Sequence, residues 1–249
     1  MPKPSLLLVL PIYNEETDLE RSMRRLFAYA NERLGGYNWR IMVGDNASTD
    51  RSPQIYRRLA EEDRRFTYLR IEQKGRGRIL KKIWLEEPFD FSLYMDLDLS
   101  TDVQHIKQCV DKLATRDYQL CIGSRLMRGA KVIGRNLKRE VLSRMYICIV
   151  KLMFPSKLSD YQCGFKGITK EAALLLLPHI EDPTWFFDSE LLLLAERLGL
   201  PIYQEPVIWR DDPGSTVKIW KTATDDLAGL IRLRRTKPWK QIDMSTWPS

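Results

Sequence analysis

Two aspartates one residue apart, Asp96 and Asp98, are the residues whose types and spacing most clearly suggest chemistry. They follow the apolar run Phe91–Met95, which is typical of a buried strand. Side chains two residues apart on a strand point to the same face, so at the strand's end both carboxylates can meet at a divalent cation. Hard oxygen ligands suit Mg²⁺ or Mn²⁺, and these ions usually bind substrate phosphates. The alternative is a simple turn, because aspartate also favours turns.

Two further polar clusters follow apolar runs earlier in the chain. The segment Pro11–Glu16 comes after Leu6–Leu10 and could form a nucleotide cradle, although Asn14 could equally cap the next helix. The segment Asp45–Asp50 comes after Trp39–Val43. Its first aspartate could accept a hydrogen bond from an N–H group of a base, and its later polar residues could cap a helix.

Three basic residues, Lys74, Arg76 and Arg78, are interleaved with two glycines. The glycines let a ligand approach the backbone, and the side chains supply positive charge, so the segment suits a diphosphate. The alternative is an exposed basic turn. The pattern is neither a Walker A motif nor a Rossmann fingerprint.

Basic residues and a short apolar segment lie together in the second half of the chain. Arg125 follows a predicted strand, and Arg139 lies in the basic stretch Arg135–Phe154. The last ten residues of that stretch, Met145–Phe154, are mostly apolar and too few to span a bilayer. We expect a buried helix or a helix in the membrane interface. The cluster could hold a phosphate whose lipid tail lies along the apolar face, or it could be a basic helix facing water.

Asp188 lies among bulky apolar residues in the segment Trp185–Glu190. A buried acid is costly unless it is paired or functional, which suggests a site. The alternative is an N-cap for the helix expected over Ser189–Leu198.

The order of apolar runs predicts an α/β fold with a doubly wound, mostly parallel sheet flanked by helices. In such sheets ligands bind at the carboxyl ends of the strands, where these polar clusters lie. We expect Ser159–Thr169 to be a polar loop and Pro201–Trp209 to be a late strand. The earlier strands are expected at Leu6–Leu10, Trp39–Val43, Phe66–Ile71, Phe91–Met95 and Gln119–Gly123.

Composition narrows the class of protein. The 249 residues suit one large domain, and the net charge of +7 implies an anionic partner such as nucleic acid, a nucleotide sugar or a membrane surface. Four scattered cysteines without a CxxC pair argue against a zinc site. No apolar run reaches the length of a membrane span, and we see no export signal. We expect a catalytic domain over residues 1–217 and a basic tail over 218–249.

Five motifs in this order resemble family 2 glycosyltransferases of the GT-A fold, over roughly residues 5–220. The subgroup is that of polyprenyl-phosphate glycosyltransferases, which includes dolichyl-phosphate β-glucosyltransferases and mannose synthases. The motifs are Leu10–Glu16, Gly44–Asp50, Asp96–Ser100, Gly123–Arg125 and Asp160–Lys166.

The resemblance implies inverting transfer of a hexose from a nucleotide diphosphate-sugar, UDP-glucose or GDP-mannose, to a dolichyl or undecaprenyl phosphate. Asp98 would bind Mg²⁺ or Mn²⁺, with Asp96 also on the donor. The donor site would include Pro11, Tyr13, Glu15, Asp45, Lys74 and Arg78. The acceptor phosphate would be held by Arg125, Arg139, Gln162 and Arg210, with Asp188 near the acceptor.

Three alternatives remain at this point. A nucleotidyltransferase also places acidic residues after strands of an α/β sheet, but it needs a glycine-rich N-terminal loop with a basic residue, where this chain has Pro11–Glu16. A saccharide or protein acceptor would need a general base, for which Asp188 is the candidate. A nucleic-acid-binding module fits the charge but has no recognition motif, so we expect no nucleic-acid partner. If the acceptor is a lipid, attachment to the cytoplasmic face of a membrane would come from residues 135–155, the basic tail or a membrane partner subunit.

Overall fold

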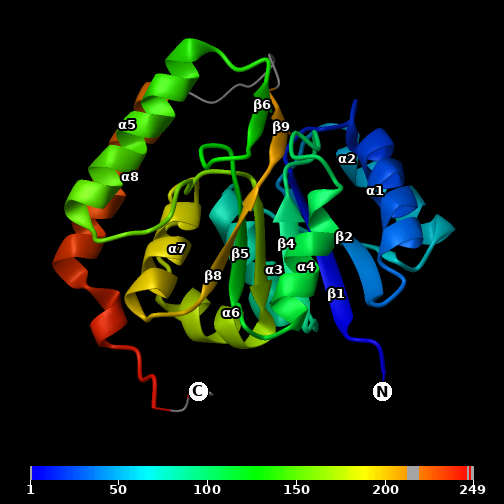
Figure 1. Cartoon of the computed structure of the whole chain (residues 1–249). Helices are drawn as coiled ribbons and strands as arrows, with labels where there is room; N and C mark the ends of the chain where they lie inside the picture. The colour runs from blue at the N-terminus through cyan, green and yellow to red at the C-terminus, as the bar shows by residue number, and fades with distance from the viewer. Residues whose placement is uncertain (1, 212–218, 246, 248–249) are drawn as a thin grey trace.

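The computed structural model describes residues 2–211, 219–245 and 247, with Lys138 and residues 219–222 described by their backbone alone. A sheet of seven strands runs through the molecule in the order β3-β2-β1-β4-β7-β5-β8 (Figure 1). Its strands are β1 (Ser5–Ile12), β2 (Asn38–Asn46), β3 (Phe66–Ile71), β4 (Phe91–Met95), β5 (Leu120–Ser124), β7 (Phe165–Thr169) and β8 (Ile202–Pro206). A second sheet pairs β6 (Lys131–Ile133) in parallel with β9 (Ile208–Arg210).

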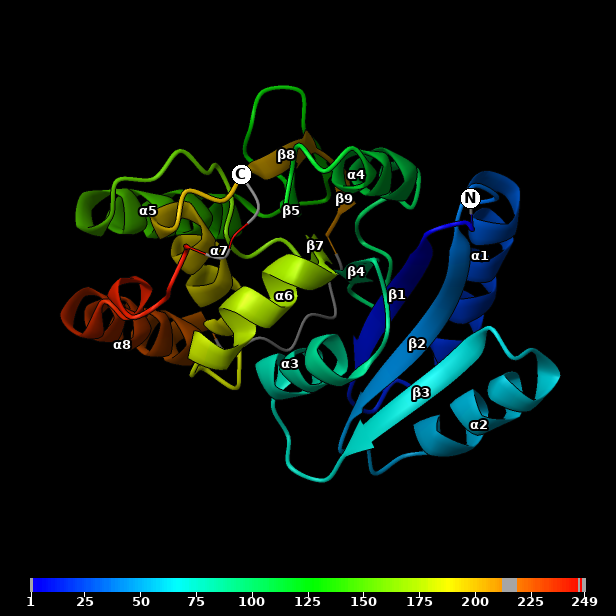
Figure 2. The same ribbon diagram turned by 90° about the horizontal axis from the view of Figure 1, so that it is seen from below.

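Helices cover both faces of the large sheet. One layer consists of α1 (Leu19–Arg33), α2 (Ser52–Glu62) and α4 (His105–Ala114). The other consists of α3 (Arg76–Glu86), α6 (Lys170–Leu176) and α7 (Phe187–Arg197), with short 3₁₀ turns at Leu177–His179 and Pro238–Lys240. Outside this second layer, α5 (Leu137–Met153) and α8 (Ile219–Thr236) lie side by side at the edge of the molecule farthest from β3 (Figure 2).

The aliphatic run of β1 explains why it lies inside the sheet. Leu7 and Val9 pack into one core, whereas Leu6, Leu8 and Leu10 pack into the other. A strand buried on both faces in this way is typical of a parallel sheet covered by two helical layers. β1 pairs in parallel with β2 and with β4, which brings their carboxyl ends to one edge.

The α/β fold class expected from the sequence is confirmed, and β3 and β4 occupy the expected residues. The expected polar loop over Ser159–Thr169 is wrong at its end, because residues 165–169 form β7, antiparallel between β4 and β5. Lys166 made this strand hard to predict, because lysine is rarely buried. In the structure it is buried: its amine donates to the Cys163 carbonyl and lies 3.3 Å from the Asp188 carboxylate.

The expected strand Pro201–Trp209 is divided in two. β8 ends at Pro206 in the large sheet, and β9 continues in the small sheet. The four cysteines are free thiols. Among the described residues, no helix is both long and apolar enough to cross a bilayer. The expected boundary between residues 217 and 218 lies outside the described residues.

Candidate functional site

The two aspartates lie on a tight turn at the carboxyl end of β4. The Leu99 N–H donates to the Asp96 carbonyl at 3.1 Å, and Leu99 has a φ of 52°, a left-handed conformation that is unusual for leucine. The Asp98 carboxylate accepts hydrogen bonds from the Ser100 N–H at 2.8 Å and from its hydroxyl at 2.6 Å. Asp98 is exposed, so its carboxylate faces the sheet edge where the polar loops gather.

Asp96 is fixed by a glycine of the neighbouring strand entry. Its N–H donates to the Gly164 carbonyl at 3.0 Å. A Cβ atom built on Gly164 would lie 1.8 Å from Asp96 Oδ2, so no residue larger than glycine fits there while Asp96 keeps its position. The glycine of the Asp160–Lys166 motif therefore shapes the aspartate pair.

Arg76, at the start of α3, is the cation nearest this pair. Its Nη2 lies 2.7 Å from Asp96 Oδ1, and the guanidinium lies 4.8 Å from the Trp185 ring. Burial opposes its charged form, but the pKa of Arg76 is raised because Asp96, Tyr94 and Asp188 surround it with negative potential. Its Nε is buried without a hydrogen-bond acceptor, whereas its Nη2 faces the Asp96 carboxylate. Buried donors of this kind are the expected lining of an anion site.

Tyr13 and Lys74, two of the predicted donor-site residues, lie together. The Lys74 amine is 3.1 Å from the centre of the Tyr13 ring, a cation–π contact between the end of β1 and the loop before α3. Arg78 is turned away: its Nη1 donates to the carbonyls of Gln73 and Lys74 at 3.1 and 2.6 Å, which fixes the loop itself. The loop is also anchored by a bond from the Gly75 N–H to the Asn46 side chain.

Asp45 is buried rather than open to a ligand. Its carboxylate accepts from the Ser48 N–H at 2.8 Å, the Tyr56 hydroxyl at 3.0 Å and Arg70 Nη1 at 2.6 Å. Burial and this carboxylate raise the pKa of Tyr56 to about 12. Asp45 thus holds the loop after β2 in shape, and its predicted contact with a base stays a prediction.

The other predicted donor residues lie on the same edge. Pro11 pairs with Gly44 in the β1–β2 register. The Glu15 N–H donates to the Ser52 hydroxyl at 3.0 Å, which ties the β1 loop to the start of α2.

Arg125 forms a buried bidentate ion pair. Its Nε and Nη2 lie 2.7 and 3.0 Å from the two carboxylate oxygens of Asp160, and its guanidinium packs 5.0 Å from the Trp209 ring. Burial raises the pKa of Asp160, but the charge and hydrogen bonds of Arg125 dominate and lower it. The pair joins the end of β5 to the Asp160–Lys166 motif.

Arg139 and Arg135 lie next to this pair at the start of α5. Arg139 Nη1 is 3.1 Å from Asp211 Oδ2, and about a third of its side chain (32%) is exposed. The Arg135 side chain is only 8% exposed, contacts Glu140 at 3.3 Å, and keeps its Nη1 buried without an acceptor. Burial and the neighbouring Arg125 lower the pKa of Arg135. A buried donor without an acceptor, beside two further arginines, is a candidate contact for an anion.

The other two residues predicted to hold the acceptor phosphate, Gln162 and Arg210, differ in exposure. Gln162 donates to the buried carboxylate of Asp226 on α8 at 2.5 Å. Arg210 is largely exposed at the rim and lies 3.8 Å from Asp102.

Asp188 is buried and already partnered. Its Oδ1 accepts from the Tyr94 hydroxyl and lies 3.3 Å from the Lys166 amine. It does not cap α7, because the N-cap position is Phe186 and makes no side-chain cap bond. The N-cap alternative is therefore wrong, and the acid neutralises a buried lysine.

The aspartate turn fits a divalent-cation site in which water and substrate supply most of the ligands. In the described part of the chain, no group of three or more His, Cys, Asp or Glu side chains could hold a metal. Mg²⁺ and Mn²⁺ nevertheless commonly use one or two carboxylates and take their other ligands from water and substrate phosphates. Asp98 is the exposed candidate ligand, whereas Asp96 is held beside Arg76.

The sequence pattern predicts Arg76 only as one of three basic residues, and it does not single out Arg135 or Asp160 as site residues. The alternation of arginine and glycine does not show which arginine side chain points toward the aspartate pair. In the structure the start of α3 is fixed by a hydrogen bond from the Gly77 N–H to the Thr184 carbonyl at 3.2 Å, and Arg76 is the arginine that contacts Asp96.

Comparisons with known proteins show the family and the fold of this chain. The sequence model of glycosyl transferase family 2 matches residues 7–175. Glycosyltransferase AglD of Haloferax volcanii is 34% identical over 213 residues, which is 85% of this chain but only 34% of that protein. The dolichyl-phosphate beta-glucosyltransferase of Saccharomyces cerevisiae is 27% identical, covering 86% of this chain and 69% of the relative. This chain thus spans about a third of AglD and about two thirds of the yeast enzyme.

Among solved structures, glucosyl-3-phosphoglycerate synthase of Mycobacterium tuberculosis with uridine diphosphate has a TM-score of 0.68 at 20% identity, covering 93% of this chain and 80% of that chain. The same enzyme with Mn²⁺, UDP-glucose and phosphoglyceric acid has a TM-score of 0.64 at 18% identity, covering 97% and 82%. At these identities the likeness establishes the GT-A fold.

Proposed function

The chain belongs to glycosyl transferase family 2, and from that premise we propose that it transfers a hexose, with inversion, from a nucleotide diphosphate-sugar to a polyprenyl phosphate. One observation carries the choice of acceptor. The arginines at the start of α5, with the unsatisfied Nη1 of Arg135, adjoin an apolar stripe on the outer face of that helix. The stripe consists of the exposed side chains Leu137, Val141, Met145, Ile149 and Leu152.

The stripe follows helical spacing, so these side chains lie along one face. The helix therefore has apolar side chains on two faces. Its inner face packs against the core through Val150, and the stripe is exposed on its outer face. A phosphate held at the arginines with its hydrocarbon tail along the stripe would cover both features.

The partners of Asp188 support a phosphate acceptor over a hydroxyl acceptor. A sugar or protein hydroxyl needs a base to remove its proton, and Asp188 is buried with Lys166 and Tyr94 as partners. A phosphate is already an anion at neutral pH and needs only alignment and loss of water. Its oxygen would attack the anomeric carbon while the bond to the nucleoside diphosphate breaks, so no proton has to be transferred.

The chain's own residues supply the remaining requirements. Lys74 and Arg76 would offset the charge that grows on the departing diphosphate. Arg139 and Arg135 would orient the acceptor, and arginine suits this role because its planar fork matches phosphate oxygens. Asp98, with Asp96 beside it, would hold Mg²⁺ or Mn²⁺, which would neutralise part of the diphosphate charge.

The names of relatives support UDP-glucose as the donor over GDP-mannose. Curated relatives from yeast to human are named dolichyl-phosphate beta-glucosyltransferases, and a structural neighbour contains UDP-glucose and Mn²⁺. A lipid acceptor places the protein at a membrane surface. Attachment to the cytoplasmic face and a membrane partner subunit stay predictions.

A donor panel tests the proposal. The protein is incubated with a short polyprenyl phosphate, Mn²⁺ and either UDP-glucose, GDP-mannose, UDP-galactose or UDP-N-acetylglucosamine, and the lipid product is identified by mass spectrometry. We expect an EDTA-sensitive hexosyl lipid phosphate with UDP-glucose. Release of nucleoside diphosphate only with a soluble sugar acceptor would refute the lipid assignment.

Asp98→Asn tests the metal assignment in the same assay, and Asp117→Asn, an exposed aspartate preceding β5 at the opposite edge of the sheet, is the matched control. Loss of an electrostatic anchor for the leaving group should lower turnover roughly 100-fold or more, with the control unchanged. Wild-type turnover by Asp98→Asn would remove this residue from the metal site.

A further inference from the structure

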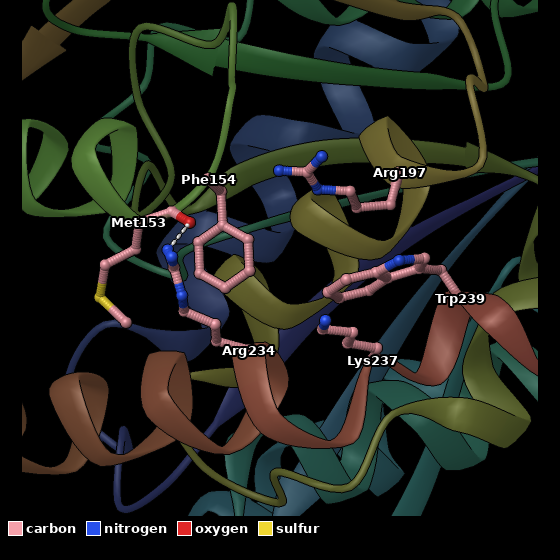
Figure 3. A pocket seen from close by; sticks show the side chains of 6 residues that line it. All are labelled: Met153, Phe154, Arg197, Arg234, Lys237 and Trp239. Carbon is pink, nitrogen blue, oxygen red and sulfur yellow. Dashed lines mark hydrogen bonds between the residues drawn. The ribbon is translucent and has the colours of Figure 1, made fainter.

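A cationic hollow lies at the far end of the α5–α8 face, away from the aspartate turn. Its volume is 270 Å³, and it is lined by Met153, Phe154, Arg197, Arg234, Lys237 and Trp239 (Figure 3). The three basic side chains come from α7, from α8 and from the residue after α8, and they converge on the Phe154 and Trp239 rings. This volume lies below the roughly 300–1,000 Å³ of clefts that hold drug-sized ligands, so the hollow suits a small group.

Among the described residues, the cations of this hollow, Arg197, Arg234 and Lys237, have no carboxylate partner. Arg234 donates to the Met153 carbonyl at 2.5 Å, and Arg197 lies 5.6 Å from both ring centres. Cations near helix ends complement the helix dipole, which explains each residue alone. It does not explain why the cations face one another around an open hollow, where their mutual repulsion favours an anion.

The hollow continues the apolar stripe of α5. Leu152, whose side chain is 83% exposed, directly precedes Met153 at the hollow's edge. On α8, which lies beside α5, Leu227 and Ile231 are 44% and 39% exposed, so this helix also presents apolar side chains to solvent. At about 1.5 Å per residue, the length of α5 separates the hollow from Arg139 by roughly 20 Å. Helix α5 therefore has arginines near its start, the hollow at its end and exposed apolar side chains between them.

We propose that this hollow binds the phosphate group of an anionic membrane phospholipid and so seats the α5–α8 face on the bilayer. Arginine and lysine supply the charge and donors that a phosphate diester needs, and tryptophan favours the depth of lipid headgroups. The apolar side chains of α5 and α8 then enter the acyl boundary, as in interfacial amphipathic helices. The site rests on the proposed function only in using the same membrane-facing side; its ligand is a resident lipid and not the acceptor.

Vesicle co-sedimentation without any nucleotide sugar tests the site. The full chain is mixed with phosphatidylcholine vesicles that contain or lack phosphatidylglycerol. The variant Arg197→Gln/Lys237→Gln is compared with Lys3→Gln/Arg25→Gln, which removes two exposed charges near β1 and on α1, at the other side of the molecule. Each cation near an anionic surface raises binding roughly fivefold, so the first variant should lose roughly 30-fold with phosphatidylglycerol and the control little.

Two further arms identify the ligand. Inorganic phosphate at millimolar concentration should not displace the protein from vesicles, because a free ion lacks the membrane that binds the stripe. Leu152→Ser should weaken binding to both kinds of vesicle. Equal loss by both double variants, unchanged binding of the hollow variant, or full displacement by phosphate would overturn the proposal. Transfer to a short acceptor in detergent should remain in the hollow variant, so a failure here is distinct from a failure of the proposed activity.

Discussion

Replacing Gly164 by alanine should misplace the Asp96 carboxylate while leaving the sheet intact. A Cβ atom on residue 164 would lie 1.8 Å from Asp96 Oδ2, and ordinary contact begins at 3.4 Å. The carboxylate must therefore move by about 1.6 Å, the difference between these distances. Gly164 has no positive φ, so the change adds no backbone strain of its own.

The expected effect falls on turnover. Misplacing a positioned group by about 1 Å can cost roughly 100-fold, so we expect kcat with the nucleotide sugar to fall by at least this factor. Rotation of Asp96 also removes its contact with the largely buried Arg76, which should cost about 1–3 kcal/mol of folding free energy. For a chain of this size that is a decrease in Tm of roughly 2–12 °C.

The assay compares kcat, the KM for the donor and the Tm of Gly164→Ala with those of Gly35→Ala. Gly35 lies in a turn where an added Cβ meets nothing within 4 Å, so the control repeats the chemical change without the collision. A kcat within tenfold of the native value in a folded Gly164→Ala protein would refute the argument that Asp96 must stay in place.

Three further changes test the buried charges. The pKa of Asp226 is raised to about 7, mainly by burial. Between about pH 4 and pH 7 the folded protein therefore keeps a proton on Asp226 that the unfolded chain releases, so the free energy of unfolding falls as pH rises through this range. Asp226→Asn, which can still accept from Gln162, should therefore raise the Tm at about pH 8 and leave it unchanged near pH 4; an equal shift at both values contradicts this. Asp188→Asn leaves Lys166 buried without its counter-charge and should cost about 3–5 kcal/mol in urea unfolding, whereas a loss under about 1 kcal/mol would show that the pair is not needed. Arg135→Gln should raise the KM for the polyprenyl phosphate roughly tenfold and leave that for the donor unchanged, and the reverse pattern would move this residue to the donor side.

Two strands of the sheet could be predicted to the residue from the local pattern of the sequence. Phe91–Met95 is buried throughout, and Phe66–Ile71 is bounded by polar turns, so both strands fall on the predicted residues. The position of the aspartate pair followed at once, because Asp96 comes directly after β4. Local pattern was sufficient for these two strands because polar residues flank each run, although β4 also pairs antiparallel with β7.

Elements whose burial depends on distant partners could not be predicted in this way. β7 contains Lys166 and Gly167, which reads as a loop until the pairing of that lysine with Asp188 is known. Gly167 is needed because a Cβ there would lie 2.7 Å from the Cys121 sulfur. The tail helix α8 was also not assigned from its sequence, although Leu233 on it is fully buried.

The same dependence on distant partners separates the acids that stabilise the site from the arginines proposed to bind substrate. Asp45 and Asp160 are buried with partners at hydrogen-bond distance and hold loops in place, and Asp188 offsets the charge of the buried Lys166. Arg76 and Arg135 also contact carboxylates, but each keeps one buried donor, Nε and Nη1 respectively, without an acceptor. Unsatisfied buried donors are costly, and the cost is recovered when an anion binds. One of these arginines begins α3, on the proposed donor side, and the other precedes α5, on the proposed acceptor side, as the proposed transfer between two phosphate-bearing substrates would need.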